Sequence, residues 1–191
     1  AGRPLSAIPI SERRWSGCGL PSDDGISMWH ARILGGRAFY SGIDKPEDCG
    51  YLGADFGRTF CGGWGLDAFY RRNSGQAPRL GDFRLNKDGG YMNHVGAKLT
   101  WQRSFGRSRF YGWLGAGPEY FWTEEYLAND TGWGFLAEVG IGYVLSKNWR
   151  ILLGLEFHGD KTSAGRLEAK DDGTSRWLWT WVPILGVEFD W

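Results

Sequence analysis

The sequence predicts an all-β protein, an eight-stranded antiparallel up-and-down transmembrane β-barrel, and three observations support this fold class. Large apolar residues alternate with small or polar residues along eight segments, and this is the period of a β-strand. The connections between the segments alternate between short and long. Aromatic residues gather near the ends of the segments, with aliphatic residues between them. The length of 191 residues suits a single domain.

The eight predicted strands follow one another, and helical spacing of apolar residues does not recur between them. Their ranges are about Met28–Tyr40, Tyr51–Phe60, Trp64–Arg72, His94–Phe105, Arg109–Trp122, Trp133–Leu145, Trp149–His158 and Trp177–Trp191. Tight turns are expected at Cys61–Gly63, Gly106–Ser108 and Ser146–Asn148. Longer polar loops are expected at Ser41–Gly50, Asn73–Asn93, Thr123–Gly132 and Gly159–Arg176. This strict alternation predicts a meander whose tight turns all lie at one end.

The two faces of the predicted strands differ in a way that indicates a lipid-facing exterior. The segment Trp133–Leu145 carries large apolar residues on one face, and three glycines with Leu136, Glu138 and Val144 on the other. A soluble barrel would turn its apolar face inward. Glycine suits the interior of an eight-stranded barrel, which has room for little more than side chains. The large apolar faces are therefore expected to point outward, toward lipid.

Aromatic side chains support this orientation, because the two interfaces of a bilayer select belts of Trp and Tyr. The expected belts include Tyr51 and these tryptophans: Trp29, Trp64, Trp122, Trp133, Trp149, Trp177, Trp179 and Trp191. Outward positions between the belts are mostly aliphatic, as at Ile33, Val139 and Leu153.

Five residues fit this barrel less simply. Arg37, Arg58 and Arg103 have outward parity, but they lie near strand ends, where an Arg side chain can extend to the head groups. Pro118 and Pro183 lie within predicted strands, where proline cannot donate a ladder hydrogen bond. A bulge or a local break in pairing is expected beside each proline.

Composition excludes several other classes. Lys plus Arg and Asp plus Glu both total 22, so no bulk charge indicates a nucleic-acid partner. No stretch approaches the roughly 18 apolar residues of a membrane helix. Glycine-rich turns such as Cys61–Gly63 lack the following helix of a phosphate-binding loop, and we expect no cofactor. The three His and three Cys show no ligand spacing, so no metal site is expected.

Parity places charged residues inside the predicted barrel. The expected interior network comprises Arg32, Asp55, Asp67, Lys98, Glu119, Glu138, Arg150, Glu156 and Glu188, together with Arg71, His30, His94 and His158. Closure of the barrel should bring Glu188 near Arg32, and adjacent strands should bring Lys98 near Glu119. Buried charges require partners, so a network of salt bridges is expected. This network either seals the barrel or lines a narrow gated pore.

The sequence resembles the small eight-stranded bacterial outer-membrane β-barrels of the OmpA, OmpX and Ail type. The strand–turn–strand unit Gly53–Ala68 is similar to theirs, and Val187–Trp191 resembles their C-terminal assembly signal, which usually ends in Phe. The resemblance implies short periplasmic turns, longer extracellular loops and both termini in the periplasm. It also implies contact with outer-membrane lipid and lipopolysaccharide, and insertion by the barrel-assembly machinery.

Residues 1–26 show no clear periodicity and are expected to form a periplasmic tail, a strap across the barrel mouth or a plug, whereas residues 27–191 form the barrel. Cys49 and Cys61 should lie some 30 Å apart along one strand at about 3.3 Å per residue, which excludes a bond between them. A Cys18–Cys61 disulfide is favoured, since both residues would be periplasmic. Pairing of Cys18 with Cys49 would instead require a plug.

The nearest approach to a catalytic constellation is His158 and Asp160 with Ser163, at the loop end of one predicted strand, where His94 could join them. A Ser/His/Asp arrangement there could act on lipid A. The His-x-Ser motif of the outer-membrane lipid A deacylases is missing, so we favour a non-enzymatic protein.

Four functions are therefore considered. The first is a structural or surface-interaction barrel whose loops meet a protein partner or lipopolysaccharide; Arg79, Arg84 and Lys87 of one loop could bind anionic groups. The second is a narrow gated pore. The third is a lipid A-modifying enzyme, and the fourth is a subunit of a larger envelope complex.

Overall fold

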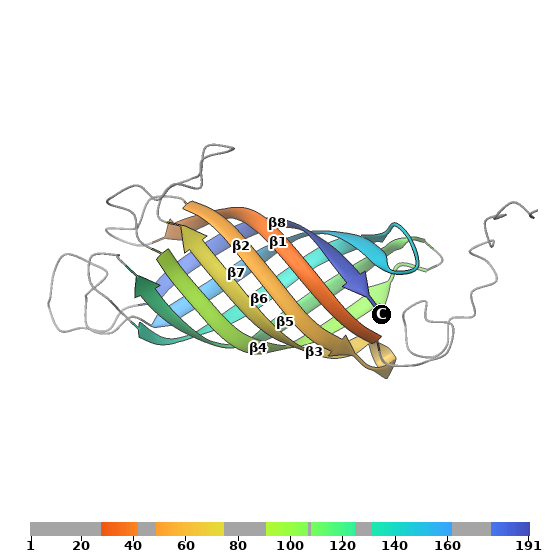
Figure 1. Ribbon diagram of the computed structural model, residues 1–191, viewed down its shortest axis with the longest axis horizontal. Helices are drawn as coiled ribbons and strands as arrows, with labels where there is room; N and C mark the ends of the chain where they lie inside the picture. The colour runs from red at the N-terminus through yellow and green to blue at the C-terminus, as the bar shows by residue number, and fades with distance from the viewer. Residues whose placement is uncertain (1–27, 42–48, 75–90, 107, 125–130, 162–176) are drawn as a thin grey trace, which may run out of the picture.

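The computed structural model describes residues 28–41, 49–74, 91–106, 108–124, 131–161 and 177–191, apart from the side chains of residues 61 and 124. These residues form one closed barrel in which every strand pairs with its neighbours in the chain and β1 pairs with β8 (Figure 1). The strands are β1 Met28–Ser41, β2 Cys49–Thr59, β3 Trp64–Ser74, β4 Tyr91–Ser104, β5 Phe110–Glu124, β6 Thr131–Val144, β7 Trp149–Lys161 and β8 Trp177–Asp190. All pairs are antiparallel, and the predicted fold class is confirmed.

Closure satisfies the backbone of both terminal strands. Arg32 of β1 lies opposite Asp55 of β2 on one side and Glu188 of β8 on the other. At the end of the chain, Trp191 N donates to Trp29 O at 3.0 Å. A closed ladder leaves no strand edge unpaired, as the apolar part of a bilayer requires.

Most strands extend further than predicted toward the long loops, and β4 and β7 extend furthest. β4 begins at Tyr91 rather than His94, and β7 continues to Lys161 rather than His158. The added residues include Asn93 and Asp160, which are buried inside the barrel. Polar residues there indicated loops in the sequence, but they belong to the interior face of the strands.

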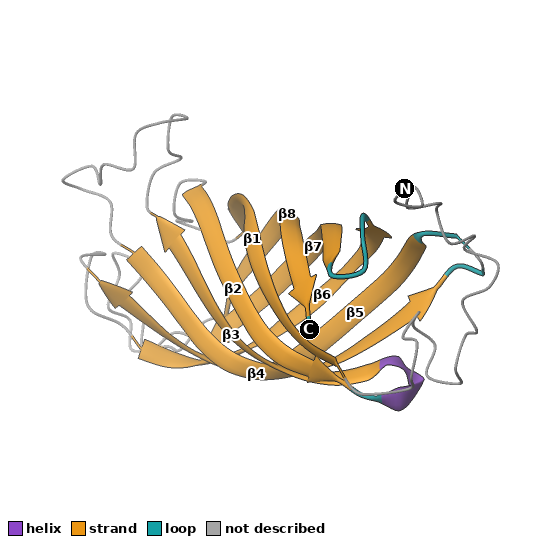
Figure 2. Ribbon diagram, turned by 45° about the vertical axis from the view of Figure 1, so that its right-hand side comes forward, coloured by secondary structure: helices purple, strands orange, loops and turns teal. Residues whose placement is uncertain are grey.

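The short connections β2–β3, β4–β5 and β6–β7 share one end of the barrel, here called the short-turn end; the opposite end is the loop end. The first of these turns contains the short 3-10 helix η2, Cys61–Gly63 (Figure 2). Gly62 and Gly63 adopt φ values of 84° and 81°, which side chains other than glycine rarely tolerate. The described part of the chain contains no helix long and apolar enough to span a membrane.

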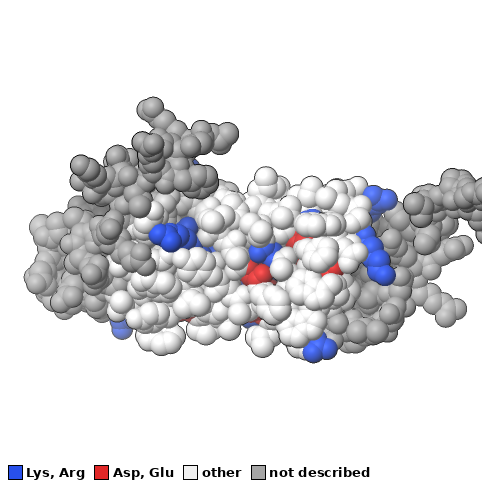
Figure 3. All heavy atoms as spheres, viewed as in Figure 1, with Lys and Arg blue, Asp and Glu red and all other residues white. Residues whose placement is uncertain are grey.

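The apolar faces of the strands point outward. Ile33, Leu153 and Leu185 are 61%, 64% and 61% exposed, an arrangement that water does not favour and lipid does. Figure 3 shows one such face, which is mostly white, with a few acidic and basic atoms visible near its middle. Arg37 and Arg103 are exposed, and Arg58 packs over the ring of Trp29 at 5.3 Å.

Glycines of the inward faces leave room for large interior side chains. A Cβ at Gly140 or Gly154 would lie 2.6 or 2.7 Å from Cζ2 of Trp113, which is buried in the lumen. Eight strands enclose little space, so a bulky side chain on one strand requires glycine on its neighbours.

All eight expected interfacial tryptophans lie on the outer surface. Seven of them lie beside another aromatic ring. Trp29, Trp64, Trp149 and Trp191 lie at the short-turn end, and Trp122, Trp133, Trp177 and Trp179 lie at the loop end. The prediction for Tyr51 is wrong. It lies inside the barrel, because it shares the parity of Asp55, and its hydroxyl donates to Glu156.

Both prolines coincide with a local break in pairing, as predicted. The β4–β5 ladder lacks the pairs between Gly96–Glu119 and Leu99–Ala116, beside Pro118. The β1–β8 ladder has a similar gap beside Pro183. The register is unchanged across each gap, so neither break is a bulge.

Candidate functional site

The interior of the barrel concentrates buried charge. Among the described residues, eight carboxyl groups face four Arg and Lys side chains and three His, and none is more than 4% exposed. The carboxyl groups belong to Asp55, Asp67, Glu119, Glu138, Glu156, Asp160, Glu188 and Asp190, and the cations to Arg32, Arg71, Lys98 and Arg150. All ten Asp, Glu, Arg and Lys residues predicted for the interior lie there. Asp160 and Asp190 were not among them.

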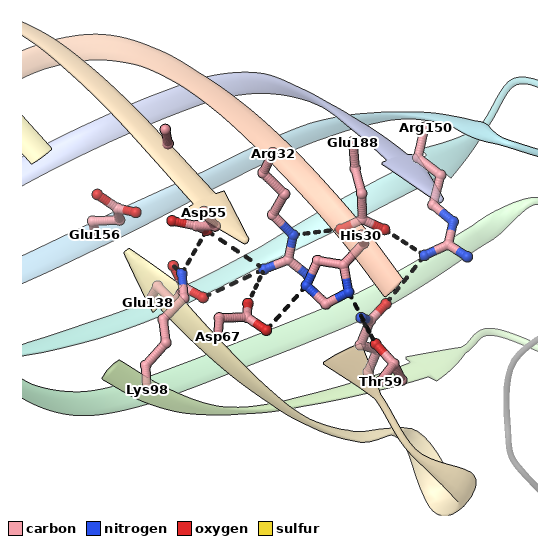
Figure 4. A network of polar contacts seen from close by, with 12 residues as sticks. His30, Arg32, Asp55, Thr59, Asp67, Lys98, Glu138, Arg150, Glu156 and Glu188 are labelled. Atoms are coloured by element: carbon pink, nitrogen blue, oxygen red, sulfur yellow. Dashed lines mark hydrogen bonds and ion pairs between the residues drawn. The ribbon is translucent and has the colours of Figure 1, made fainter. Parts of the chain in front are cut away.

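Most of these groups form one ion network, which comprises the four cations with Asp55, Asp67, Glu138, Glu156, Glu188, Asp190 and His30. Arg32 lies at its centre (Figure 4). Its guanidinium donates to Glu188 and, at 3.2 Å, to Asp67. The predicted proximity of Arg32 and Glu188 follows from the closure of β1 on β8.

Lys98 has different partners from those predicted. Its ammonium donates to Asp55 at 2.8 Å and to Glu138 at 2.6 Å, whereas Glu119 lies beside His158. The residue opposite Glu119 on β4 is Gly96, which is two positions nearer the loop end than Lys98. The stagger of the strands therefore separates the predicted pair.

Arg71 connects the middle of the network to Glu156. Its Nη2 donates to Glu156 Oε1 at 2.7 Å, and its Nη1 donates to Asp55. Tyr51 donates its hydroxyl to the same Glu156 carboxylate. Glu156 of β7 thus accepts hydrogen bonds from β2 and β3, and these bonds link opposite sides of the barrel.

At the short-turn end, Arg150 lies between two carboxylates of the last strand. It donates to Glu188 and lies 3.0 Å from Asp190. His30 Nε2 lies 3.0 Å from Asp67 Oδ1. Every carboxylate in this half of the barrel therefore has an Arg, Lys or His within ion-pair distance.

Nearer the loop end lies a second group, the histidine cluster, formed by His94, Glu119, His158 and Asp160. His158 Nδ1 lies 3.0 Å from Glu119 Oε2, and His94 Nε2 lies 3.1 Å from Asp160 Oδ2. The two imidazole rings are 4.9 Å apart between centroids. All four side chains have no exposed surface.

Of the catalytic candidates, His158 lies in the lumen, as its parity predicted. Asp160 has the same parity and is also buried in the lumen rather than exposed to lipid head groups. His158 contacts Glu119, and Asp160 contacts His94. Ser163 lies outside the described residues. His94 does join this group.

The sequence predicted no metal site, but the structure brings together three side chains whose donor atoms metals accept. His94, Glu119 and His158 each offer one ligand atom, and these atoms lie within 4.8 Å of one another. The residues come from β4, β5 and β7, so they share no motif of fixed spacing. The available signal was their common inward parity near the loop ends of three strands.

The expected disulfide between Cys18 and Cys61 stays a prediction, since residue 18 and the side chain of residue 61 lie outside the described residues. The same holds for the N-terminal segment 1–26. Cys49 is buried at the loop end, with its Sγ 3.3 Å from the Tyr40 hydroxyl.

The comparisons with known proteins concern this fold. Neither a family model nor a curated protein matches the chain. Among solved structures, Neisserial surface protein A (NspA) superposes with a TM-score of 0.64 at 13% identity, over 86% of this chain and 97% of that one. The N-terminal β-barrel domain of Pseudomonas aeruginosa OprF gives 0.52 at 13% identity, over 85% and 97%.

The chain has the fold of a small outer-membrane β-barrel. Both similar structures are eight-stranded outer-membrane barrels, and the apolar exterior described above is the surface that such a barrel presents to lipid. Identities of 13% establish the fold and not a shared activity. The function has to be argued from this chain's own residues.

Proposed function

We propose that the protein is a sealed, non-enzymatic barrel of the bacterial outer membrane with a structural or surface-interaction role. Both termini face the periplasm, and the long loops face outward. The barrel contacts outer-membrane lipid and lipopolysaccharide through its sides, and it is inserted by the barrel-assembly machinery.

The observation that carries this proposal is the filling of the lumen by paired side chains. Arg71 joins β3 to β7 on the opposite side of the barrel. Arg32 and Lys98 each join strands that are not neighbours, and all the carboxylates involved are no more than 4% exposed. Removing one partner of a buried pair costs about 3–5 kcal/mol, so opening a path between these groups is expensive. The interior therefore supports a structural role rather than passage of solutes.

A planar-bilayer conductance measurement tests the seal. Wild-type protein should show no steady open steps, and Arg71→Ala should introduce brief, irregular openings because Asp55 and Glu156 lose their common partner. Stable, uniform steps of the wild-type protein would contradict the sealed barrel.

A narrow cation-selective pore is the second candidate, and the excess of buried carboxyl groups over Arg and Lys favours it. If this candidate holds, stable wild-type steps should select cations over anions and lose that selectivity in Glu138→Gln. The sealed barrel predicts neither behaviour.

The surface role is assigned to the connections at the loop end. An epitope inserted within residues 162–176 should be labelled by antibody on intact cells, whereas one inserted at Ser146–Asn148 should need permeabilised cells. The reverse pattern would overturn the orientation.

Replacing Arg79, Arg84 and Lys87 together by Gln should weaken binding to vesicles containing lipopolysaccharide, since each cation contributes roughly 1 kcal/mol at an anionic surface.

A further inference from the structure

We propose that His94, Glu119 and His158 form a binding site for one divalent transition-metal ion, such as Zn²⁺, inside the loop-end half of the barrel. This inference goes beyond the proposed function, because it holds whether or not the lumen conducts.

The geometry needs only small side-chain movements. Ligand atoms around a tetrahedral ion at about 2.0–2.1 Å lie about 3.3 Å from one another. Here His158 Nδ1 and Glu119 Oε2 are 3.0 Å apart, and all three ligand atoms lie within 4.8 Å. The widest separation therefore has to shrink by no more than about 1.5 Å to reach the tetrahedral spacing. The two imidazole rings are already neighbours, with centroids 4.9 Å apart.

The donor atoms have the right chemistry. Two imidazoles and one carboxylate form a set that zinc and its neighbours in the transition series accept, whereas Mg²⁺ and Ca²⁺ prefer oxygen alone. His94 Nδ1 is buried and lacks a hydrogen-bond partner, so it is available as a ligand. His158 would bind through Nδ1, which already faces Glu119, while its Nε2 lies 3.7 Å from Glu156 Oε2. Asp160 contacts His94 Nε2 at 3.1 Å, as a carboxylate does when it orients a metal-bound imidazole.

Charge also favours a cation at this position. Among the described residues, no Arg or Lys lies within ion-pair distance of Glu119 or Asp160. Both carboxylates flank Gly134 of β6, which pairs with Glu119 on one side and Asp160 on the other. A Cβ at Gly134 would lie 2.6 Å from Asp160 Oδ1, so glycine makes the room that the carboxylates occupy.

The third buried histidine provides a matched control. His30 lies in the same lumen and contacts Asp67 at 3.0 Å, but Asp67 is already held by Arg32. Its other neighbour at hydrogen-bonding distance is Thr59, 3.4 Å from Nδ1. His30 therefore lacks a second imidazole and a carboxylate without an Arg partner.

The test uses full-length protein without a polyhistidine tag, folded in detergent with Zn²⁺ and then dialysed, and it measures bound zinc by mass spectrometry. We expect about one zinc per chain for the wild type and for His30→Gln, and at least a tenfold loss for the double variant His94→Gln/His158→Gln. Asp160→Asn should weaken affinity by about 10–100-fold.

A second measurement does not depend on any variant. Wild-type protein folded with Co²⁺ should show the intense visible absorption of a tetrahedral site, and Zn²⁺ should abolish it by displacement. Zinc far below one per chain together with a Co²⁺ spectrum like that of the aqueous ion would overturn the proposal. Equal zinc in the wild type and in a folded double variant would also overturn it, and the His–carboxylate pairs would then only fill space.

Discussion

The two halves of the lumen hold buried carboxylates in different ways. Toward the short-turn end, the ion network opposes its carboxylates with Arg32, Arg71, Lys98 and Arg150. Toward the loop end, Glu119 and Asp160 of the histidine cluster have imidazoles as their nearest charged or chargeable partners. Arg and Lys carry a permanent charge, whereas imidazole is neutral or charged according to its surroundings and binds metals. The network therefore suits a permanent seal, and the cluster suits an exchangeable cation.

The largest expected effect is the loss of the central cation of the network. Arg32→Met leaves Glu188 and Asp67 without their common partner, so the free energy of unfolding should fall by about 3–5 kcal/mol. Urea unfolding in lipid vesicles, followed by tryptophan fluorescence, measures this change. The exposed Arg103→Gln is the control and should change it by less than about 0.5 kcal/mol. A loss below about 1 kcal/mol for Arg32→Met would show that the network is not essential.

The effect of zinc on stability should distinguish the histidine cluster from the ion network. At a free concentration about 100 times its dissociation constant, zinc should stabilise the wild type by about 2.7 kcal/mol, because it binds the folded state alone. His94→Gln/His158→Gln should lose this gain, whereas His30→Gln should keep it. The readout is the midpoint of urea unfolding with and without a chelator. A gain that persists in the double variant would place the zinc elsewhere.

A smaller loss in the free energy of unfolding is expected at Glu156, between the ion network and the histidine cluster. Tyr51→Phe removes the hydroxyl that donates to Glu156, which Arg71 also contacts. A hydrogen bond to a charged group contributes about 1.5–3 kcal/mol, and the remaining Arg71 contact should keep the loss at the lower end of this range. Tyr70→Phe offers a comparison, since its hydroxyl donates at 2.7 Å to Asn93, a neutral side chain, and should cost less. Equal losses would contradict the special position of Glu156.

Sequence patterns predicted which residues face inward, but they predicted few of the contacts between them. Alternation alone places Arg32, Asp55 and Glu188 in the lumen, because the period of a strand is two. Partner choice depends on the stagger of the strands around the barrel, which no local pattern encodes. The predicted partner of Lys98 was therefore wrong.

The aromatic and polar residues at the loop end were the other source of error. Tyr51 fitted an interfacial belt by residue type, although its parity is that of Asp55. Parity placed His158 in the lumen, but Asp160 was assigned to the following loop, because polar residues at a predicted strand end usually mark a loop. Their role becomes apparent only when β4, β5 and β7 are brought around one lumen.

The most direct test is a crystal structure of zinc-loaded protein with anomalous scattering data. We predict one zinc peak about 2.0–2.1 Å from a nitrogen of His94 and of His158, with Arg32 still between Glu188 and Asp67 and no continuous water column through the network. A lumen filled with a water column, with no metal beside the histidines and with Arg32 separated from both carboxylates, would contradict it.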